Sequence, residues 1–145
     1  MTRALFAAIA LLFGGSALAG DVHDVEGVWA TTDGGGHVKI EACGEDSICG
    51  TLVWFSALDN GEGPYLDDNN KDEALRDRPI LGLQMLEGFE RRNKGWRRGT
   101  IYDPESGNTY ASKLTLRDDG VLQVDGCVLF ICRAEYWTRV DEATT

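Results

Sequence analysis

The chain has little of the chemistry that enzymes use. It contains only two histidines, His23 and His37, and it lacks the nucleophile-elbow and metalloprotease motifs. His37 stands at a predicted strand start beside three glycines, which indicates an exposed strand residue more than a catalytic base. No pair among the 24 acidic residues is set apart for acid–base work. The sequence therefore predicts no catalytic residues, no metal site and no cofactor, and it favours a binding protein over an enzyme.

Basic residues are also scarce. Lys and Arg number 14 against 24 Asp and Glu, so the formal net charge is −10. Binding to nucleic acid needs basic clusters that displace counterions from phosphate, and anionic lipid surfaces attract basic segments in the same way. The charge balance argues against both partners, and we interpret the acid excess as a solubilising surface.

Long apolar runs are absent except at the N-terminus. Residues 4–13 are apolar, Arg3 precedes them, and residues 17–19 read Ala-Leu-Ala, the small-x-small pattern of a cleavage site. A membrane span needs about 20 apolar residues, so this run is too short for one. The pattern predicts a signal peptide over residues 1–19, a single domain over residues 20–145, and an exported protein in the periplasm or outside the cell.

The four cysteines fall in two close pairs. Cys43 lies near Cys49, and Cys127 lies near Cys132 around a short apolar turn. In an exported protein such pairs indicate local disulfides across hairpin turns. A four-cysteine zinc site is the alternative, but its paired ligands usually stand two to four residues apart, and export favours oxidation. We expect the disulfides Cys43–Cys49 and Cys127–Cys132.

The rest of the chain has strand periodicity and hardly any helical periodicity. Short β-branched and aromatic segments alternate with turns rich in Gly, Asp, Asn and Pro. The eight predicted strands cover residues 27–32, 37–42, 50–55, 79–89, 96–102, 109–116, 121–124 and 135–140. Serial hairpins of this kind form a meander, and closing it removes both sheet edges. We therefore predict an all-β, eight-stranded antiparallel up-and-down barrel, in preference to a sandwich.

One long polar segment, residues 59–78, interrupts this pattern and carries a predicted helical turn at residues 72–76. Loops of this length in a compact domain are functional or disordered. An EF-hand that begins at Asp67 fails, because Lys71 takes the fifth position and Asp72 takes the sixth, where Gly is required. A solvated loop is the default interpretation, and an irregular calcium site is the alternative.

Resemblances to two groups of known proteins make the predicted fold more specific. Gly27-x-Trp29 on the first strand and Arg139 on the last resemble the lipocalin and fatty-acid-binding (calycin) barrels, in which the Arg lies over the Trp and closes one end. A guanidinium over an indole is a favourable cation–π contact. The mature chain as a whole resembles the exported bacterial family called domain of unknown function 2147. That resemblance implies a lipocalin-like fold and assigns no reaction.

The family resemblance rests on motifs along the whole mature chain. The matching segments are residues 27–29, 43 with 49–50, 54, 75–79, 82, 99–104, 107, 110, 126–127 and 137–140. One departure is Asn70-Lys71-Asp72, where the family pattern has Asn-Pro-Asp, so this loop is expected to differ in shape.

Aromatic and arginine side chains are the candidate binding residues. Barrel interiors can gather aromatic residues from separate strands, either as ligand-lining groups or as packed core. Two arginines flank the end of the long loop and either grip a ligand carboxylate or pair with the acidic loop. These candidates are Trp54, Arg76, Arg78, Trp96, Tyr102 and Tyr110.

We therefore expect a periplasmic lipocalin-like barrel that binds a small apolar or amphipathic ligand, with an anionic end held by Arg78. The alternative is an envelope structural or protein-interaction module with a packed barrel, which would use the loop at residues 59–78.

Overall fold

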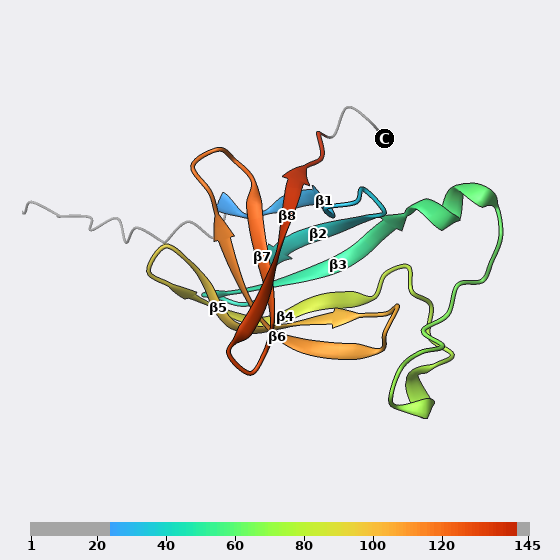
Figure 1. Cartoon of the computed structure of the whole chain (residues 1–145). Coiled ribbons are helices and arrows are strands. Elements are labelled where there is room, and N and C mark those ends of the chain that lie inside the picture. Colours follow the sequence, from blue (N-terminus) through green and yellow to red (C-terminus); the bar gives the residue numbers. More distant parts are fainter. Residues whose placement is uncertain (1–23, 142–145) are drawn as a thin grey trace, which may run out of the picture.

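The computed structural model describes residues 24–141, so the predicted signal peptide lies outside the described residues. Eight antiparallel strands close into one barrel in sequence order, each hydrogen-bonded to the next, with the last beside the first (Figure 1). The strands are β1 (Gly27–Ala30), β2 (Gly36–Ala42), β3 (Ser47–Phe55), β4 (Gln84–Arg92), β5 (Gly95–Asp103), β6 (Asn108–Leu116), β7 (Leu122–Val128) and β8 (Ile131–Arg139). This confirms the predicted eight-stranded all-β barrel.

Alternation along the strands explains which side chains form the core. In β2, Val38 and Ile40 are buried, whereas the alternating residues Lys39 and Glu41 are exposed to solvent. Successive side chains of a strand point to opposite faces, so one face of each strand fills the barrel. Both predicted disulfides are formed: Cys43, just after β2, bonds to Cys49 of β3, and Cys127 of β7 bonds to Cys132 of β8.

The core occupies one end of the barrel. Trp29, Trp96, Trp137 and Phe89 are buried there with a shell of aliphatic side chains. The aliphatic members include Ile40, Ile48, Leu86, Leu114, Leu122 and Val124. This packed half is the closed end, and the other half of the barrel is the open end, or mouth.

A contact between the first and last strands finishes the closed end. Arg139 lies over the Trp29 ring, with Cζ 4.3 Å from the ring centroid, and its Nη1 and Nη2 donate to the carbonyls of Glu26 and Asp24. A Cβ at residue 27 would approach Arg139 Nη1 to 2.6 Å, and φ there is 127°, so the position requires glycine. Pairing of β1 with β8 is short and joins Trp29 to Arg139 and Ala30 to Thr138.

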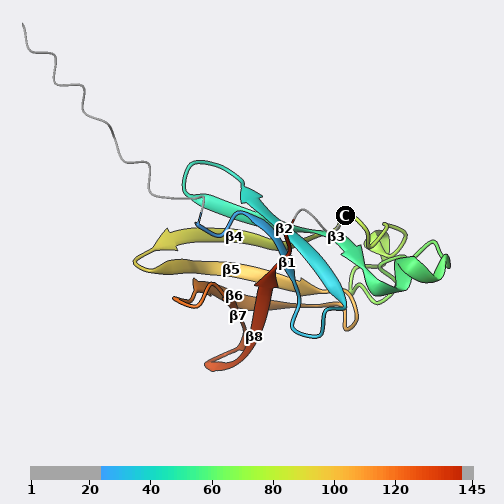
Figure 2. The ribbon, with the colours of Figure 1, turned by 90° about the horizontal axis from the view of Figure 1, so that it is seen from above.

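The long connection between β3 and β4, residues 56–83, stands at the opposite end and is called the mouth loop below (Figures 1 and 2). It contains two short 3-10 helices, η2 (Ser56–Asn60) and η3 (Glu73–Leu75), the second within the predicted helical turn. The predicted strand over residues 79–89 is wrong in its first part, because β4 begins at Gln84.

Backbone pairing inside the mouth loop accounts for that difference. Leu66 pairs with Pro79, Asp67 N–H donates to the Arg78 carbonyl, and Ile80 N–H donates to the Tyr65 carbonyl. The apolar residues that follow Pro79 therefore return the chain to the mouth. Among residues 24–141 no helix is long and apolar enough to cross a membrane.

Candidate functional site

A cavity of about 790 Å³ lies at the mouth, on the side of the barrel that the packed core leaves unfilled. Its floor is apolar and comes from strands β3, β4, β5 and β8 together with the mouth loop. The floor residues are Leu52, Phe55, Ile80, Met85, Ile101 and Trp137. Small-molecule sites have this size and this character, a mostly apolar lining with a few polar groups.

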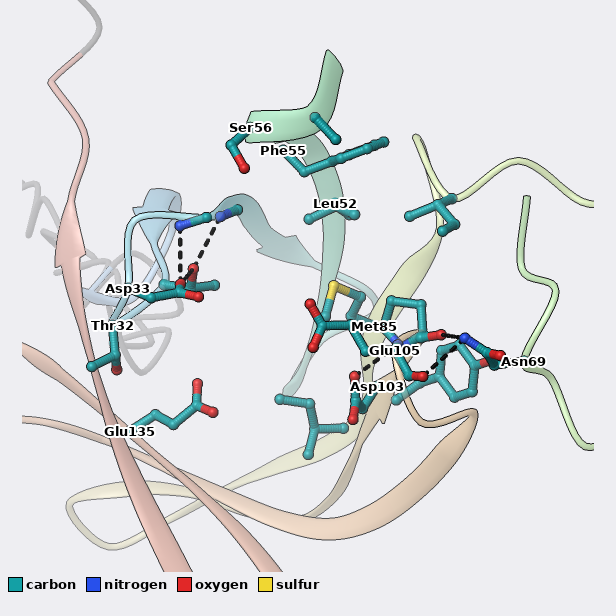
Figure 3. Close-up of a pocket in the computed structure, with 18 of the residues that line it drawn as sticks. Thr32, Asp33, Leu52, Phe55, Ser56, Asn69, Met85, Asp103, Glu105 and Glu135 are labelled. Atoms are coloured by element: carbon teal, nitrogen blue, oxygen red, sulfur yellow. Dashed lines mark hydrogen bonds between the residues drawn. The ribbon is translucent and has the colours of Figure 1, made fainter. Parts of the chain in front are cut away.

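The rim of the cavity is strongly acidic. Figure 3 shows Asp33 and Glu135 on one side, and Asp103 and Glu105 on the other. Asp68 is a fifth lining carboxylate, and Arg133 is the one basic residue in the lining. All but Asp103 are solvent-exposed, and together the five carboxylates create a negative potential at the opening, which added salt would screen.

Asp33 is held in its charged form. Its carboxylate accepts hydrogen bonds from the backbone N–H of Gly35 at 2.9 Å and from the Thr31 hydroxyl at 2.8 Å. These two bonds, the backbone one first, hold the pKa of Asp33 below its ordinary value. The carboxylate is therefore ionised at neutral pH.

The mouth loop forms one wall of the cavity and is tied to the β5–β6 turn. Asn69 Nδ2 donates to the Glu105 carbonyl at 2.9 Å, and Lys71 Nζ donates to the Ser106 carbonyl at 3.2 Å. Gly107 lies directly against the Asn69 carbonyl, where a Cβ would clash with the backbone, and its φ is 69°. The loop thus sits in a fixed position over the barrel.

A buried carboxylate strengthens this attachment. The Asp67 side chain is inaccessible to solvent and accepts hydrogen bonds from the Tyr102 hydroxyl, from Asn70 Nδ2 at 2.7 Å and from Arg78 Nε at 2.8 Å. Asn70 Nδ2 also lies 3.0 Å from the Tyr102 hydroxyl. Tyr102 belongs to β5, so this group joins the loop to the barrel wall. It is called the Asp67 cluster below.

The cluster shifts the titration of both acids. Burial by itself would raise the pKa of Asp67, but the hydrogen bonds from Tyr102, Asn70 and Arg78 and the charge of Arg78 outweigh it, and the pKa is lowered. Burial, followed by the hydrogen bond to Asp67 and its negative charge, raises the pKa of Tyr102. An ionised Asp67 and a neutral Tyr102 are therefore the stable pair across the neutral range.

The structure places only Tyr102 of the six predicted binding residues at the mouth cavity. Arg78 instead lines a second cavity of about 570 Å³ beside the mouth loop, which Tyr102 also borders, and Arg78 lies 5.5 Å from the Tyr102 ring centroid. Arg76 Nε donates to the Asn70 carbonyl at 2.8 Å. Both arginines thus contact their own loop.

The other three aromatic candidates lie elsewhere. Trp54 stacks on His37 with ring centroids 4.4 Å apart, and its indole N–H donates to Asp59. Trp96 is buried in the closed-end core. Tyr110 is partly buried, and its hydroxyl accepts a hydrogen bond from Asn108 Nδ2 at 3.3 Å.

Two kinds of site residue are not predicted by the sequence. The sequence presents Asp67 as the start of a failed EF-hand and Asn70 as part of a departure from the family pattern, and nothing in it distinguishes the rim carboxylates Asp33 and Glu135 among 24 acids. A buried Asp gives no signal in one sequence unless its partners are known. Among the described residues 24–141 no group of three or more His, Cys, Asp and Glu is arranged to hold a metal ion.

Comparisons with known proteins agree with this architecture. The family model described as "Uncharacterized protein conserved in bacteria (DUF2147)" matches residues 27–139. No curated protein matches the chain in sequence. Among solved structures, protein HP1028 from the human pathogen Helicobacter pylori, described as belonging to the lipocalin family, is similar with a TM-score of 0.71 and 16% identity. The match covers 81% of this chain and 84% of that one, and at this identity it shows a shared lipocalin-like fold.

Proposed function

The chain belongs to the bacterial DUF2147 family, and we propose that it is a lipocalin-like barrel that binds a small, largely apolar or amphipathic molecule in the mouth cavity. The observation that carries this proposal is the cavity of about 790 Å³, with its apolar floor and polar rim, above a fully packed closed end. A barrel that served only as a structural module would gain stability from a core filled through its whole length. An apolar-lined cavity left open at the mouth suits a ligand.

The lining explains why the ligand is apolar in its inner part. Phe55, Met85 and Ile101 are only partly buried, and each lines the mouth cavity. Covering such surface contributes about 25 cal/mol for each Å² removed from water. An alkyl chain or a ring placed on this floor would supply the cover that the protein itself lacks.

The rim selects the outer part of the ligand. Five carboxylates face Arg133 alone, so an anionic end group would meet a repulsive potential, whereas a neutral or cationic end group would not. Arg78, the residue expected from the sequence to grip an anionic end, is paired with Asp67. We therefore propose an amphipathic ligand with a neutral or cationic end.

We also propose that the protein works outside the cytoplasm, in the periplasm. The two disulfides support this, because disulfides persist in oxidising compartments and are rare in the cytosol. The N-terminal sequence pattern at residues 1–19 points the same way.

Titration with a neutral apolar fluorescent probe, N-phenyl-1-naphthylamine, tests the site. We expect saturable binding to the wild type and binding at least about tenfold weaker in Met85→Trp, which places an indole on the floor. The matched control is Val53→Trp, because Val53 is exposed on β3 and does not line the cavity. Equal affinity in Met85→Trp and the wild type would contradict the proposed site.

The end-group preference has its own readout in the same assay. Dodecyltrimethylammonium should displace the probe at lower concentrations than dodecyl sulfate, both kept below their micelle concentrations, and the difference should shrink as salt is added. Stronger displacement by dodecyl sulfate would overturn the end-group assignment while leaving the cavity itself intact as a site.

A further inference from the structure

The turn between β7 and β8 exposes four consecutive large apolar side chains. Val128, Leu129, Phe130 and Ile131 are 59%, 86%, 91% and 77% exposed. The other exposed large hydrophobic residues in residues 24–141 stand singly and are less exposed, none above the 46% of Leu81. Scattered single residues of this kind are normal on a protein surface, whereas a contiguous group marks an interaction site. Residues 128–131 are called the apolar tip below.

The apolar tip is a firm protrusion. In both views the β7–β8 turn extends away from the other loops of the barrel (Figures 1 and 2). Val128 pairs with Ile131 and Cys127 pairs with Cys132, and the Cys127–Cys132 disulfide ties the base of the turn. Leu129 and Phe130 therefore stand at the apex of a short hairpin that is held in shape by strand pairing and by the disulfide at its base.

Leu129 and Phe130 are not the residue types that a two-residue hairpin turn favours. Leu129 adopts φ 54°, the left-handed region, where Gly, Asn or Asp are the usual residues of a two-residue hairpin turn. A leucine there strains the backbone and exposes apolar surface at once. Local strain of this kind points to a function that needs the side chain.

We propose that the apolar tip inserts into the interface of a lipid bilayer whose headgroups are zwitterionic. The tip is narrow and convex, and it carries one aromatic side chain and three aliphatic ones. It has four residues, whereas each partner in a stable protein interface contributes about 20–30. A fluid bilayer adapts to such a shape, and Phe and Leu are typical residues of interfacial insertion.

Charge identifies the kind of bilayer. Residues 126–132 contain no charged side chain, and the whole chain carries a net charge of −10. Anionic lipid would repel the protein, and no basic cluster at the tip offsets this repulsion. Insertion is therefore driven by apolar burial and is favoured on zwitterionic lipid.

Insertion would place the mouth close to the bilayer surface. Arg133 and Glu135 follow the tip on β8 and line the mouth cavity. The binding of the tip does not depend on the cavity having a ligand, so the two proposals can fail separately.

Co-flotation with vesicles of pure phosphatidylcholine tests the insertion. The variant is Leu129→Gly with Phe130→Asn. Only Leu129 has a positive φ, and Gly is the residue preferred at that first turn position, so the variant should keep or raise the melting temperature. We expect the wild type to float with the vesicles and the variant to bind at least about tenfold more weakly. Leu81→Ser, a change at a single exposed apolar residue away from the tip, is the matched control and should bind as the wild type does.

Four results would overturn the proposal. The first is that the wild type fails to float, and the second is that the tip variant floats as well as the wild type. The third is that Leu81→Ser weakens flotation as much as the tip variant does, and the fourth is that flotation requires phosphatidylserine in the vesicles. Sedimentation equilibrium in the absence of lipid adds one more: a dimer that only the tip variant abolishes, without flotation of the wild type, would identify a second copy of the chain as the occupant.

Discussion

Removing the Tyr102 hydroxyl tests whether the Asp67 cluster holds the mouth loop on the barrel. In Tyr102→Phe the ring and its contact with Arg78 remain, and only the hydrogen bonds to Asp67 and Asn70 are lost. The Asp67 carboxylate keeps its other two donors, Asn70 Nδ2 and Arg78 Nε, so the variant removes one of three hydrogen bonds to the charge. A hydrogen bond to a charged group contributes about 1.5–3 kcal/mol, and we expect a loss of this size in the free energy of unfolding.

Tyr65→Phe is the matched control. The Tyr65 hydroxyl also belongs to a mouth-loop contact, but it donates to the neutral carbonyl of Ala57 at 3.1 Å. A bond between neutral groups contributes about 0.5–1.5 kcal/mol, so this variant should lose less than Tyr102→Phe. Both tyrosines border the mouth cavity, which keeps the comparison close.

Urea unfolding followed by tryptophan fluorescence measures the global loss, and amide hydrogen exchange locates it. The Asn70 and Ile80 amides donate within the mouth loop, to the carbonyls of Asp67 and Tyr65, so they should exchange faster in Tyr102→Phe. If Tyr102→Phe costs no more than Tyr65→Phe, and the two amides exchange as in the wild type, then the cluster does not anchor the loop.

Three further predictions concern stability. Trp29→Ala should cost about 3–5 kcal/mol as a buried large-to-small change under Arg139, and a loss below about 1 kcal/mol in urea unfolding would show that the closed end does not depend on this contact. Reducing both disulfides should lower the melting temperature and leave the barrel folded by circular dichroism. Each disulfide closes a loop of only five or six residues and therefore contributes only about 2 kcal/mol to stability. Unfolding on reduction at 25 °C would contradict this. The pKa of Asp67 is lower in the folded protein than in the unfolded chain. The stability advantage of the wild type over Asp67→Asn should therefore be complete at pH values above about 3.9, the pKa of an unfolded Asp, and should shrink as the pH falls through the pKa of Asp67 in the folded protein. An advantage that does not change between neutral and strongly acid pH would refute that linkage.

Much of the barrel could be predicted from the sequence because it follows from local rules. Period-two alternation and regular turn residues predict each hairpin, and hairpins in series predict the meander. The exceptions are the β7–β8 hairpin, whose strands run to Val128 and from Ile131, beyond the predicted ends at residues 124 and 135, and the start of β4. Residues 79–83 have the apolar composition of a strand, but Gly82 takes φ 85° and Ile80 bonds back to Tyr65, and these tertiary contacts outweigh the local pattern.

The candidate site was harder to predict because it depends on which face each side chain takes. Trp54 would share a face with Leu52 by simple alternation. A register shift at His37 and Val38 changes this, so that Phe55 lines the cavity with Leu52 and Trp54 stacks on His37. One extra residue in a strand reverses the inward and outward positions, and a single sequence does not mark where such a bulge falls.

The volume of the cavity and the burial of Asp67 have the same cause. Both depend on how far the mouth loop reaches across the barrel and on which side chains meet there, and these are long-range contacts. The sequence shows the loop, its acids and its arginines, and it leaves open whether Arg78 grips a ligand or the loop; in the structure Arg78 Nε lies 2.8 Å from Asp67 Oδ2.

Native mass spectrometry of the protein isolated from its own host tests the ligand-binding proposal most directly. The wild type and Val53→Trp should each carry an additional small-molecule mass that is lost on gentle activation, and Met85→Trp, with an indole on the cavity floor, should carry none. The absence of any bound mass in the wild type, or the same bound mass in Met85→Trp, would contradict a ligand in the mouth cavity.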